Sequence, residues 1–326
     1  MEFLYETIAA VTWQQVIMWC LGALLIFLAI KKDMEPALLL PMGFGAILIN
    51  IPFSGAEGVM SSLFAIGIEM NEIMPLVLFI GIGAMIDFGP LLSNPKLFLF
   101  GGAAQFGIFL TILLAAACGF SIEDAASIGI IGAADGPTSI VVAQTLKSNY
   151  VGPIMVVAYS YMALVPIIQP AVIKLTTTKK ERLIRMEYKP ASVSKRTKIL
   201  FPILVTIVSG LIAPASLSLV GMLMFGNLIR ECGVLNYLTD TAKDVLTNLV
   251  TLFLGITIAF TMKAENFITV QTLMIMGLGL CAFIFDTFSG VMLAKVMNLF
   301  LKEKINPMIG AAGISAFPMS ARIVQK

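Results

Sequence analysis

The sequence of 326 residues contains no histidine, and Lys, Arg, Asp and Glu together make up only 12% of it. The lack of histidine removes the commonest metal-binding side chain and the one that most often titrates near neutral pH. The low charge excludes a water-soluble domain, because 59% of the residues are hydrophobic and a surface in water needs more charge than is left. We therefore expect an integral membrane protein whose ion or proton chemistry uses oxygen groups.

Recognisable catalytic and redox motifs are also missing. The four cysteines are far apart, form no CxxC pair and lie in or beside apolar runs, which favours packing over metal binding or disulfides. No P-loop, Rossmann, GxSxG or HExxH pattern is present, so nucleotide-driven transport and the familiar hydrolase mechanisms lack support. The cysteines are Cys20, Cys118, Cys232 and Cys281.

Long uncharged runs recur along the whole chain. Most of them reach roughly the 20 residues that cross a bilayer. They lack the alternation of barrel strands, so they should be helices, which satisfy their own backbone groups in lipid. We expect an all-α polytopic membrane protein, a single transmembrane domain over residues 1–326 with about ten or eleven apolar segments. The uncharged runs are Thr7–Ile30, Pro36–Ala56, Ile73–Ile86, Leu97–Ile122, Ser148–Ile173, Ile199–Ile229, Val245–Met262, Asn266–Phe285 and Ile305–Ala321; two more segments are 125–146, interrupted by Asp135, and 287–301, crossed by Lys295.

The only long polar segment is a basic loop at 174–198. It holds nine Lys or Arg against two Glu, a local net charge of +7. The positive-inside rule predicts that this loop is cytoplasmic. A topology signal is sufficient to explain the charge, and a docking surface for a soluble partner is the alternative. The loop divides the chain into a first half, 1–173, and a second half, 199–326.

The two halves resemble each other. Residues 78–82 (LFIGI) match 252–256 (LFLGI) at an offset of 174, and 131–136 (IGAADG) match 309–314 (IGAAGI) at an offset of 178. Two matches in the same order predict an internal repeat, and many transporters are duplications with the binding site at the repeat interface. The second copy has Gly313 where the first has Asp135, so only one half supplies a charge at this position.

Asp135 is the one ionisable residue in the run 125–146. An acid at the centre of a membrane segment costs about 2.5–3.5 kcal/mol on insertion scales, which makes it a candidate functional residue. Pro137 follows closely, and a proline lacks the amide donor that a helix needs. We therefore expect a helix break whose freed carbonyls, together with Asp135, Thr138 and Ser139, bind a hard monovalent cation such as Na⁺.

The second half contains similar breaks, at Asn306-Pro307 and near Pro318. Asn306 and Ser315 would add side-chain oxygens opposite Asp135. Arg322 follows Ser315 by seven residues, two helical turns, so it could bind a carboxylate on the same face or simply extend to the membrane surface.

Three further polar residues have ordinary explanations beside functional ones. Tyr161 offers a hydroxyl at membrane depth, but it could be a buried tyrosine with a local partner. Asp87 precedes a turn signal, as is usual at the interface, and Asp286 could cap the second of two apolar runs. The glycines beside these motifs could also serve close helix packing alone.

The motifs resemble those of a known family, the β-subunits of the sodium-pumping biotin-dependent decarboxylases that act on oxaloacetate, methylmalonyl-CoA or glutaconyl-CoA. The resemblance runs from about residue 72 to the end of the chain. It rests on 81–88 (GIGAMIDF), 132–138 (GAADGPT), 159–166 (YSYMALVP) and 306–315 (NPMIGAAGIS), continuing through Pro318 to Arg322.

The resemblance implies a membrane enzyme in which carboxybiotin loses CO₂ while Na⁺ leaves the cell and a proton is consumed. It implies that Asp135, Asn306 and Ser315 bind Na⁺, that Tyr161 and Ser315 take part in proton or Na⁺ passage, and that Arg322 lies near the carboxybiotin carboxylate. The implied fold is transporter-like, of the elevator kind, with inverted repeats and broken helices.

The resemblance also implies location and partners. The family's β-subunits are multi-pass proteins of the inner, cytoplasmic membrane. Their partners are a biotin carrier domain, a carboxyltransferase α-subunit and a small membrane-anchoring subunit, with no nucleic acid, and they assemble as homotrimers. Members continue past the match to Lys326 with another apolar segment, so we expect that the C-terminal helix of the family is missing from this sequence.

Two other functions compete with the sodium-pumping decarboxylase. A secondary Na⁺/H⁺ antiporter would exchange the two ions at Asp135 without an enzymatic step. A membrane scaffold would use the same polar breaks for helix packing alone. The pump is the leading hypothesis because the chemistry would come from carboxybiotin and the protein would supply binding, orientation and electrostatics.

Overall fold

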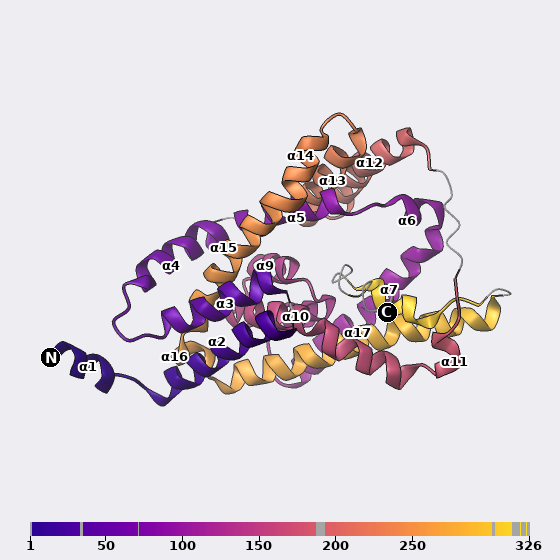
Figure 1. Cartoon of the computed structure of the whole chain (residues 1–326). Coiled ribbons are helices and arrows are strands. Elements are labelled where there is room, and N and C mark those ends of the chain that lie inside the picture. The colour runs from indigo at the N-terminus through magenta and orange to yellow at the C-terminus, as the bar shows by residue number, and fades with distance from the viewer. Residues whose placement is uncertain are drawn as a thin grey trace. The chain divides into compact units, whose positions relative to one another are not determined.

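The computed structural model of the chain describes residues 2–32, 35–70, 72–186, 193–301 and 304–314, together with Ser320 and Val324. Every regular element among these residues is a helix (Figure 1). The all-α fold class expected from the sequence is thus confirmed. The chain forms two compact units, and each combines residues from the first half with residues from the second half.

Unit 1 comprises residues 1–31, 36–95 and 189–260. Its α-helices are α1 (Glu2–Ala9), α2 (Trp13–Lys32), α3 (Pro36–Ile49), α4 (Ala56–Phe64), α5 (Ile73–Met85), α6 (Gly89–Ser93), α12 (Lys195–Ile212), α13 (Leu217–Cys232), α14 (Asn236–Asp240) and α15 (Thr247–Ala259). A short π segment, η1 (Ala65–Glu69), continues α4, and another, η5 (Thr241–Leu246), precedes α15. A 3₁₀ turn, η4 (Pro214–Ser216), joins α12 to α13.

Unit 2 comprises residues 32–35, 96–188 and 261–326. Its α-helices are α7 (Phe98–Ala117), α8 (Ile122–Gly129), α9 (Gly136–Thr145), α10 (Val151–Thr176), α11 (Lys179–Arg182), α16 (Ala264–Phe267) and α17 (Val270–Phe300). Two 3₁₀ segments, η3 (Ile130–Ala133) and η7 (Pro307–Gly313), lie in the two matched sequence motifs. The short 3₁₀ turns η2 (Pro95–Leu97) and η6 (Phe260–Met262) stand where the chain passes between the units.

Four of the described helical segments are long and apolar enough to cross a membrane, and two sharply bent helix pairs raise this to as many as six. These spans support a multi-pass membrane protein, while the expected ten or eleven segments stay a prediction. One detail of the sequence interpretation is wrong: the runs on either side of Asp286 form the single helix α17, so Asp286 is not an N-cap. The free backbone amides that an N-cap side chain can bind occur only in the first turn of a helix, and Asp286 lies in the middle of α17.

Helices α5 and α13 cross in unit 1 with their backbones in contact. A β-carbon on Gly83 would overlap the Leu223 carbonyl oxygen, and one on Gly226 would overlap the Ile80 carbonyl oxygen. Small residues on both helices allow this approach, which is the usual means of helix association in membranes. Glycine at these two positions therefore allows close helix packing in unit 1.

Asp87 joins α5 and α6 to the polar ends of α12 and α13. Its Oδ1 lies 3.1 Å from the Lys198 ammonium, and its Oδ2 lies 3.8 Å from the Arg230 guanidinium. Partial burial acts to raise the pKa of Asp87, but the Gly89 amide and the two cations outweigh it and hold that pKa below its usual range. The resulting stabilisation is present above the pKa of the unfolded chain and is lost as the pH falls through the lowered value. These contacts fit the interfacial role expected for Asp87.

Replacing Gly226 by alanine should destabilise unit 1. The added methyl group must displace the α5 backbone at Ile80, and overpacking of this kind costs about 1–3 kcal/mol. Thermal unfolding of the purified protein in detergent measures the effect as a lowered midpoint. Gly221→Ala, on the same helix with nothing within 4 Å of the added carbon, is the matched control and should leave the midpoint unchanged. Equal midpoints for the two variants would contradict the close crossing.

Candidate functional site

The first matched motif interrupts the helices of unit 2 at Asp135. The 3₁₀ turn η3 ends at Ala133, Ala134 adopts a left-handed conformation with φ 52°, and Asp135 is extended. Helix α9 then begins at Gly136, with Pro137 in its first turn, where a missing amide donor is tolerated. The break therefore occurs where the proline predicts it.

The Asp135 carboxylate lies at the N-terminal end of α9. The Thr138 hydroxyl donates a hydrogen bond of 2.6 Å to Oδ2 of Asp135. The Ser139 hydroxyl donates one of 2.8 Å to the Asp135 carbonyl. The side chain of Ser139 is buried, whereas Asp135 and Thr138 are partly accessible. Three of the residues predicted to bind a cation thus form one oxygen-rich cluster.

Tyr159, rather than Tyr161, lies against this cluster. A β-carbon on Gly136 would overlap the Tyr159 ring, and Asp135 acts electrostatically on the Tyr159 hydroxyl, which is buried without a partner among the described residues. Tyr161 donates a hydrogen bond to the Met276 carbonyl and packs with Ile131 in an apolar cluster. Residues two apart face different sides of a helix, but only the packing shows which of the two tyrosines faces Asp135. The role expected for Tyr161 stays a prediction.

In the second half, Asn306 begins η7 with both ends of its amide engaged. Its Oδ1 accepts a hydrogen bond of 3.0 Å from the Met308 amide. Its Nδ2 donates to the carbonyls of Arg182 and Ile184 in the basic loop. The amide therefore ties η7 to that loop, and an unused lone pair on Oδ1 is what it could still offer a cation.

The far end of η7 meets the break at Asp135. Ala134 and Ile314 belong to one buried apolar cluster, which also includes Val165 and Phe283. Each of the first two residues directly precedes a predicted site residue, namely Asp135 and Ser315. Ser315 and Arg322 themselves, with Pro318, lie outside the described residues. Asn306 stands at the opposite end of η7.

Two polar side chains that the sequence interpretation undervalued are buried nearby in unit 2. Oδ1 of Asp286 accepts a hydrogen bond of 3.2 Å from the Ile108 amide, and Oδ2 has no partner among the described residues. Gln169 donates a bond of 2.7 Å to the Ala311 carbonyl in η7. For Gln169 a signal existed in the sequence, because it is a polar amide between Pro166 and Pro170 in an otherwise apolar stretch.

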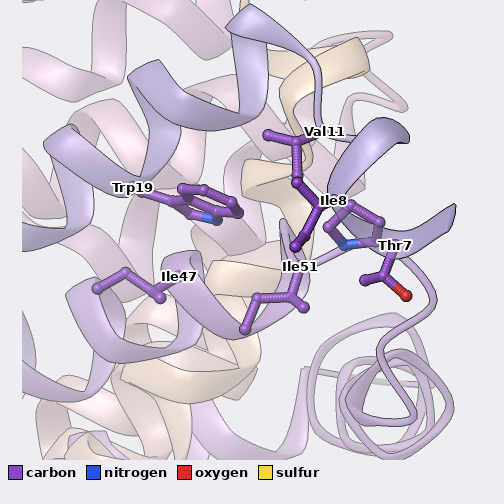
Figure 2. A pocket seen from close by; sticks show the side chains of 7 residues that line it. Thr7, Ile8, Val11, Trp19, Ile47 and Ile51 are labelled. Atoms are coloured by element: carbon purple, nitrogen blue, oxygen red, sulfur yellow. The ribbon is translucent and has the colours of Figure 1, made fainter. Parts of the chain in front are cut away.

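The structure contains two further pockets, one apolar and one basic. Figure 2 shows a pocket in unit 1 where Ile8, Val11, Trp19, Ile47 and Ile51 converge, and its apolar lining offers little to an ion. A pocket in unit 2 is basic and includes Lys180, Lys295 and Lys304; Lys295 pairs with Glu181 at 3.1 Å.

Metal binding through acids and cysteines finds no support in the described part of the chain, which contains no cluster of three such groups. The cluster at Asp135 is thus the best candidate for binding a monovalent cation.

Comparisons with known proteins give consistent results. A sequence model of the Na⁺-transporting oxaloacetate decarboxylase beta subunit matches residues 14–326. The chain is 50% identical to methylmalonyl-CoA decarboxylase subunit beta of Propionigenium modestum, over 95% of this chain and 85% of that protein. It is 49% identical to glutaconyl-CoA decarboxylase subunit beta of Acidaminococcus fermentans, over 97% of this chain and 84% of that protein.

A third similarity concerns the substrate named in the family description. The chain is 42% identical to the oxaloacetate decarboxylase beta chain of Klebsiella pneumoniae, over 96% of this chain and 86% of that protein. The resemblance stated from the sequence motifs is therefore confirmed. The chain belongs to the family of β subunits of Na⁺-transporting decarboxylases.

Proposed function

We propose that this chain is the membrane subunit in which decarboxylation of carboxybiotin drives Na⁺ out of the cell, with one proton consumed. The observation that carries the proposal is the cluster of Asp135, Thr138 and Ser139 at a helix break, in a chain of this family. A carboxylate beside a helix N-terminus and hydroxyl oxygens can hold a hard monovalent cation, and the freed backbone carbonyls add neutral ligands.

The cation is the cargo of the pump, and we assign its ligands across both matched motifs. Asp135 supplies the charge, and Thr138 and Ser139 supply hydroxyl oxygens. Asn306 and Ser315 complete the set from the second motif. The shared apolar cluster of Ala134 and Ile314 supports this assignment, because it brings the residues directly before Asp135 and Ser315 together.

Arg322, Tyr161 and Ser315 are the groups that we assign to carboxybiotin and to proton passage. A guanidinium binds a carboxylate through two parallel hydrogen bonds, which suits Arg322 to orient the carboxyl group before it is lost as CO₂. Biotin, carried on a partner subunit, supplies the leaving carboxyl group. The proton that replaces it would pass by way of the Tyr161 and Ser315 hydroxyls.

The basic surface of unit 2 is the face that we assign to the partners. In unit 2, the basic residues of the first part of the loop and the pocket of Lys180, Lys295 and Lys304 provide several cations. This charge suits an acidic biotin carrier domain and the carboxyltransferase α-subunit in the cytoplasm. A small membrane-anchoring subunit and assembly as a homotrimer in the inner membrane complete the proposed complex.

An inverted repeat, formed by the halves 1–173 and 199–326, accounts for the composition of both units. The matched residues 78–82 and 252–256 both fall in unit 1, and 131–136 and 309–314 both fall in unit 2. In unit 2 both motifs form 3₁₀ turns that pack against α7 and α17. We propose transport of the elevator kind, in which the repeats alternate access to a site between broken helices.

The antiporter and scaffold alternatives are not favoured. The relatives are named as subunits of decarboxylases, which an antiporter without enzymatic activity would not explain. A scaffold would not need a carboxylate at a helix break within the membrane, because apolar residues pack there at lower cost.

Asp135→Asn should abolish Na⁺-dependent decarboxylation in the assembled complex. The amide keeps the size of the side chain but removes the negative charge that we assign to the cation. The measurement is CO₂ release from carboxybiotin as a function of Na⁺ concentration. Asp240→Asn changes an exposed acid on α14 in the same way and should behave as the unmodified chain. A near-normal Na⁺ dependence in Asp135→Asn would refute the assignment.

The basic loop should react with a membrane-impermeant maleimide only from the cytoplasmic side. The test places a cysteine at position 180 (Lys180→Cys) in a chain whose four natural cysteines are replaced by alanine. Inside-out vesicles should be labelled and intact cells should not, because basic loops stay in the cytoplasm. Labelling after detergent treatment is the control for reactivity, and labelling of intact cells would reverse the proposed topology.

A further inference from the structure

A polar layer separates two apolar clusters where α10 and α17 of unit 2 meet. On one side, Val165 and Phe283 pack together in the cluster that contains Ala134 and Ile314. On the other side, Ile173 and Val291 pack with Ala311 of η7. The two clusters thus use the same two helices at two successive levels.

The helical repeat puts Gln169 and Thr287 between these levels. On α10 the positions 165, 169 and 173 recur at intervals of four residues, and on α17 so do 283, 287 and 291. Residues at this spacing lie one above another on a single helix face. Since the first and last members of each set pack across the interface, Gln169 and Thr287 face the same layer from opposite helices.

Both residues present a buried oxygen that has no partner within the described part of the chain. The Ala311 carbonyl can only accept, so it fixes the Gln169 amide with Nε2 toward η7 and directs Oε1 away from it. Gln169 and Thr287 are both 0% exposed, and Gln169 Oε1 and Thr287 Oγ1 are without a hydrogen bond. An unpaired polar atom at such a depth loses its hydration without replacement, so a ligand there would compensate the loss.

The Thr287 hydroxyl differs from the hydroxyls of three other helical threonines in its hydrogen bonding. The hydroxyls of Thr176, Thr206 and Thr251 each donate to the carbonyl four residues earlier, at 2.7–2.8 Å. Thr287 makes no such bond and keeps its oxygen available to the layer.

A backbone carbonyl on α10 near Gln169 also lacks its helical hydrogen bond. The carbonyl of Pro166 lacks its helical donor, because the residue four positions later is Pro170. Close contact between the backbones at Gly290 and Gly310 holds η7, and with it the Ala311 carbonyl, against α17. The layer therefore contains a buried amide oxygen and a buried hydroxyl oxygen, and a neutral helix carbonyl without its helical donor lies within one turn of Gln169 along α10.

An amide oxygen, a hydroxyl oxygen and a freed helix carbonyl are neutral oxygen groups of the kind that coordinate Na⁺ in membrane transporters. We propose that Gln169 and Thr287 form a transit site for Na⁺, separate from the cluster at Asp135 and without a charge of its own. The inference rests on the proposed Na⁺ transport, and it adds a weaker site on the same path.

Thr287→Val is the decisive variant. Valine has the shape of threonine and removes only a hydroxyl that makes no protein hydrogen bond, so a purely structural role predicts unchanged or greater stability. A transit site predicts instead that the Na⁺ concentration giving half-maximal CO₂ release rises about tenfold, with the rate at saturating Na⁺ nearly unchanged. Binding of radioactive Na⁺ to the resting complex should fall at equal free Na⁺.

Two further variants complete the test in the intact complex. Thr287→Ser keeps the hydroxyl and should restore the half-maximal concentration, whereas Thr111→Val removes another buried, unpartnered hydroxyl on α7 and should not alter it. Thr111 lies on α7, which contributes neither of the two proposed side-chain ligands. Unchanged Na⁺ dependence and Na⁺ binding in Thr287→Val would overturn the transit site while leaving the Asp135 assignment intact. Failure of the unmodified complex to release CO₂ in a Na⁺-dependent way would instead overturn the proposed function.

Discussion

Every helix break in a membrane leaves carbonyl and amide groups that hydrocarbon cannot solvate, and the structure of unit 2 depends on where these groups find partners. At η7 the partners are side-chain amides: Asn306 pairs with the Met308 amide at the start, and Gln169 pairs with the Ala311 carbonyl near the end. At Asp135 the break is closed by hydroxyls, since Ser139 donates to the backbone carbonyl and Thr138 to the carboxylate. The groups that satisfy the breaks are therefore also the groups that could bind ions.

Close backbone packing is what makes these breaks tolerable. Gly290 and Gly310 lie against each other, so η7 is held on α17 although it is too short to be stable by itself. Gly132 and Gly107 similarly leave room for Asp286 where α7 and α17 cross, and a β-carbon on either would overlap the carboxylate. Glycine in these positions combines two uses, access of one backbone to another and space for a buried polar side chain.

A good part of the candidate site could be predicted from local sequence. The cluster of Asp135, Thr138 and Ser139 follows from spacing alone, because a proline in the first turn fixes the start of α9 and side chains near a helix start face its free amides. The choice between Tyr159 and Tyr161 could not be made in this way. Both belong to α10, and only the packing of Gly136 on the Tyr159 ring distinguishes the residue near Asp135.

The environment of Asp286, by contrast, could not be predicted from local sequence. Its sequence setting, between two apolar runs, favoured a capping role, whereas in α17 it is fully buried and accepts a hydrogen bond from Ile108 on a different helix. Nothing local in the sequence specifies that contact, because the two residues are 178 positions apart. The same holds for Gln169 and Ala311, which are joined over 142 positions.

The sequence by itself determined the class of the protein, its helical nature, the basic loop, the place of the break at Asp135 and the family. These features depend on composition, on helix chemistry at proline and on motifs contiguous along the chain. Only the tertiary structure decided which polar groups are paired and which oxygens are left without partners at the meeting of α10, α17 and η7. Such pairing depends on contacts between segments far apart in the chain, and periodicity within one segment carries no information about them.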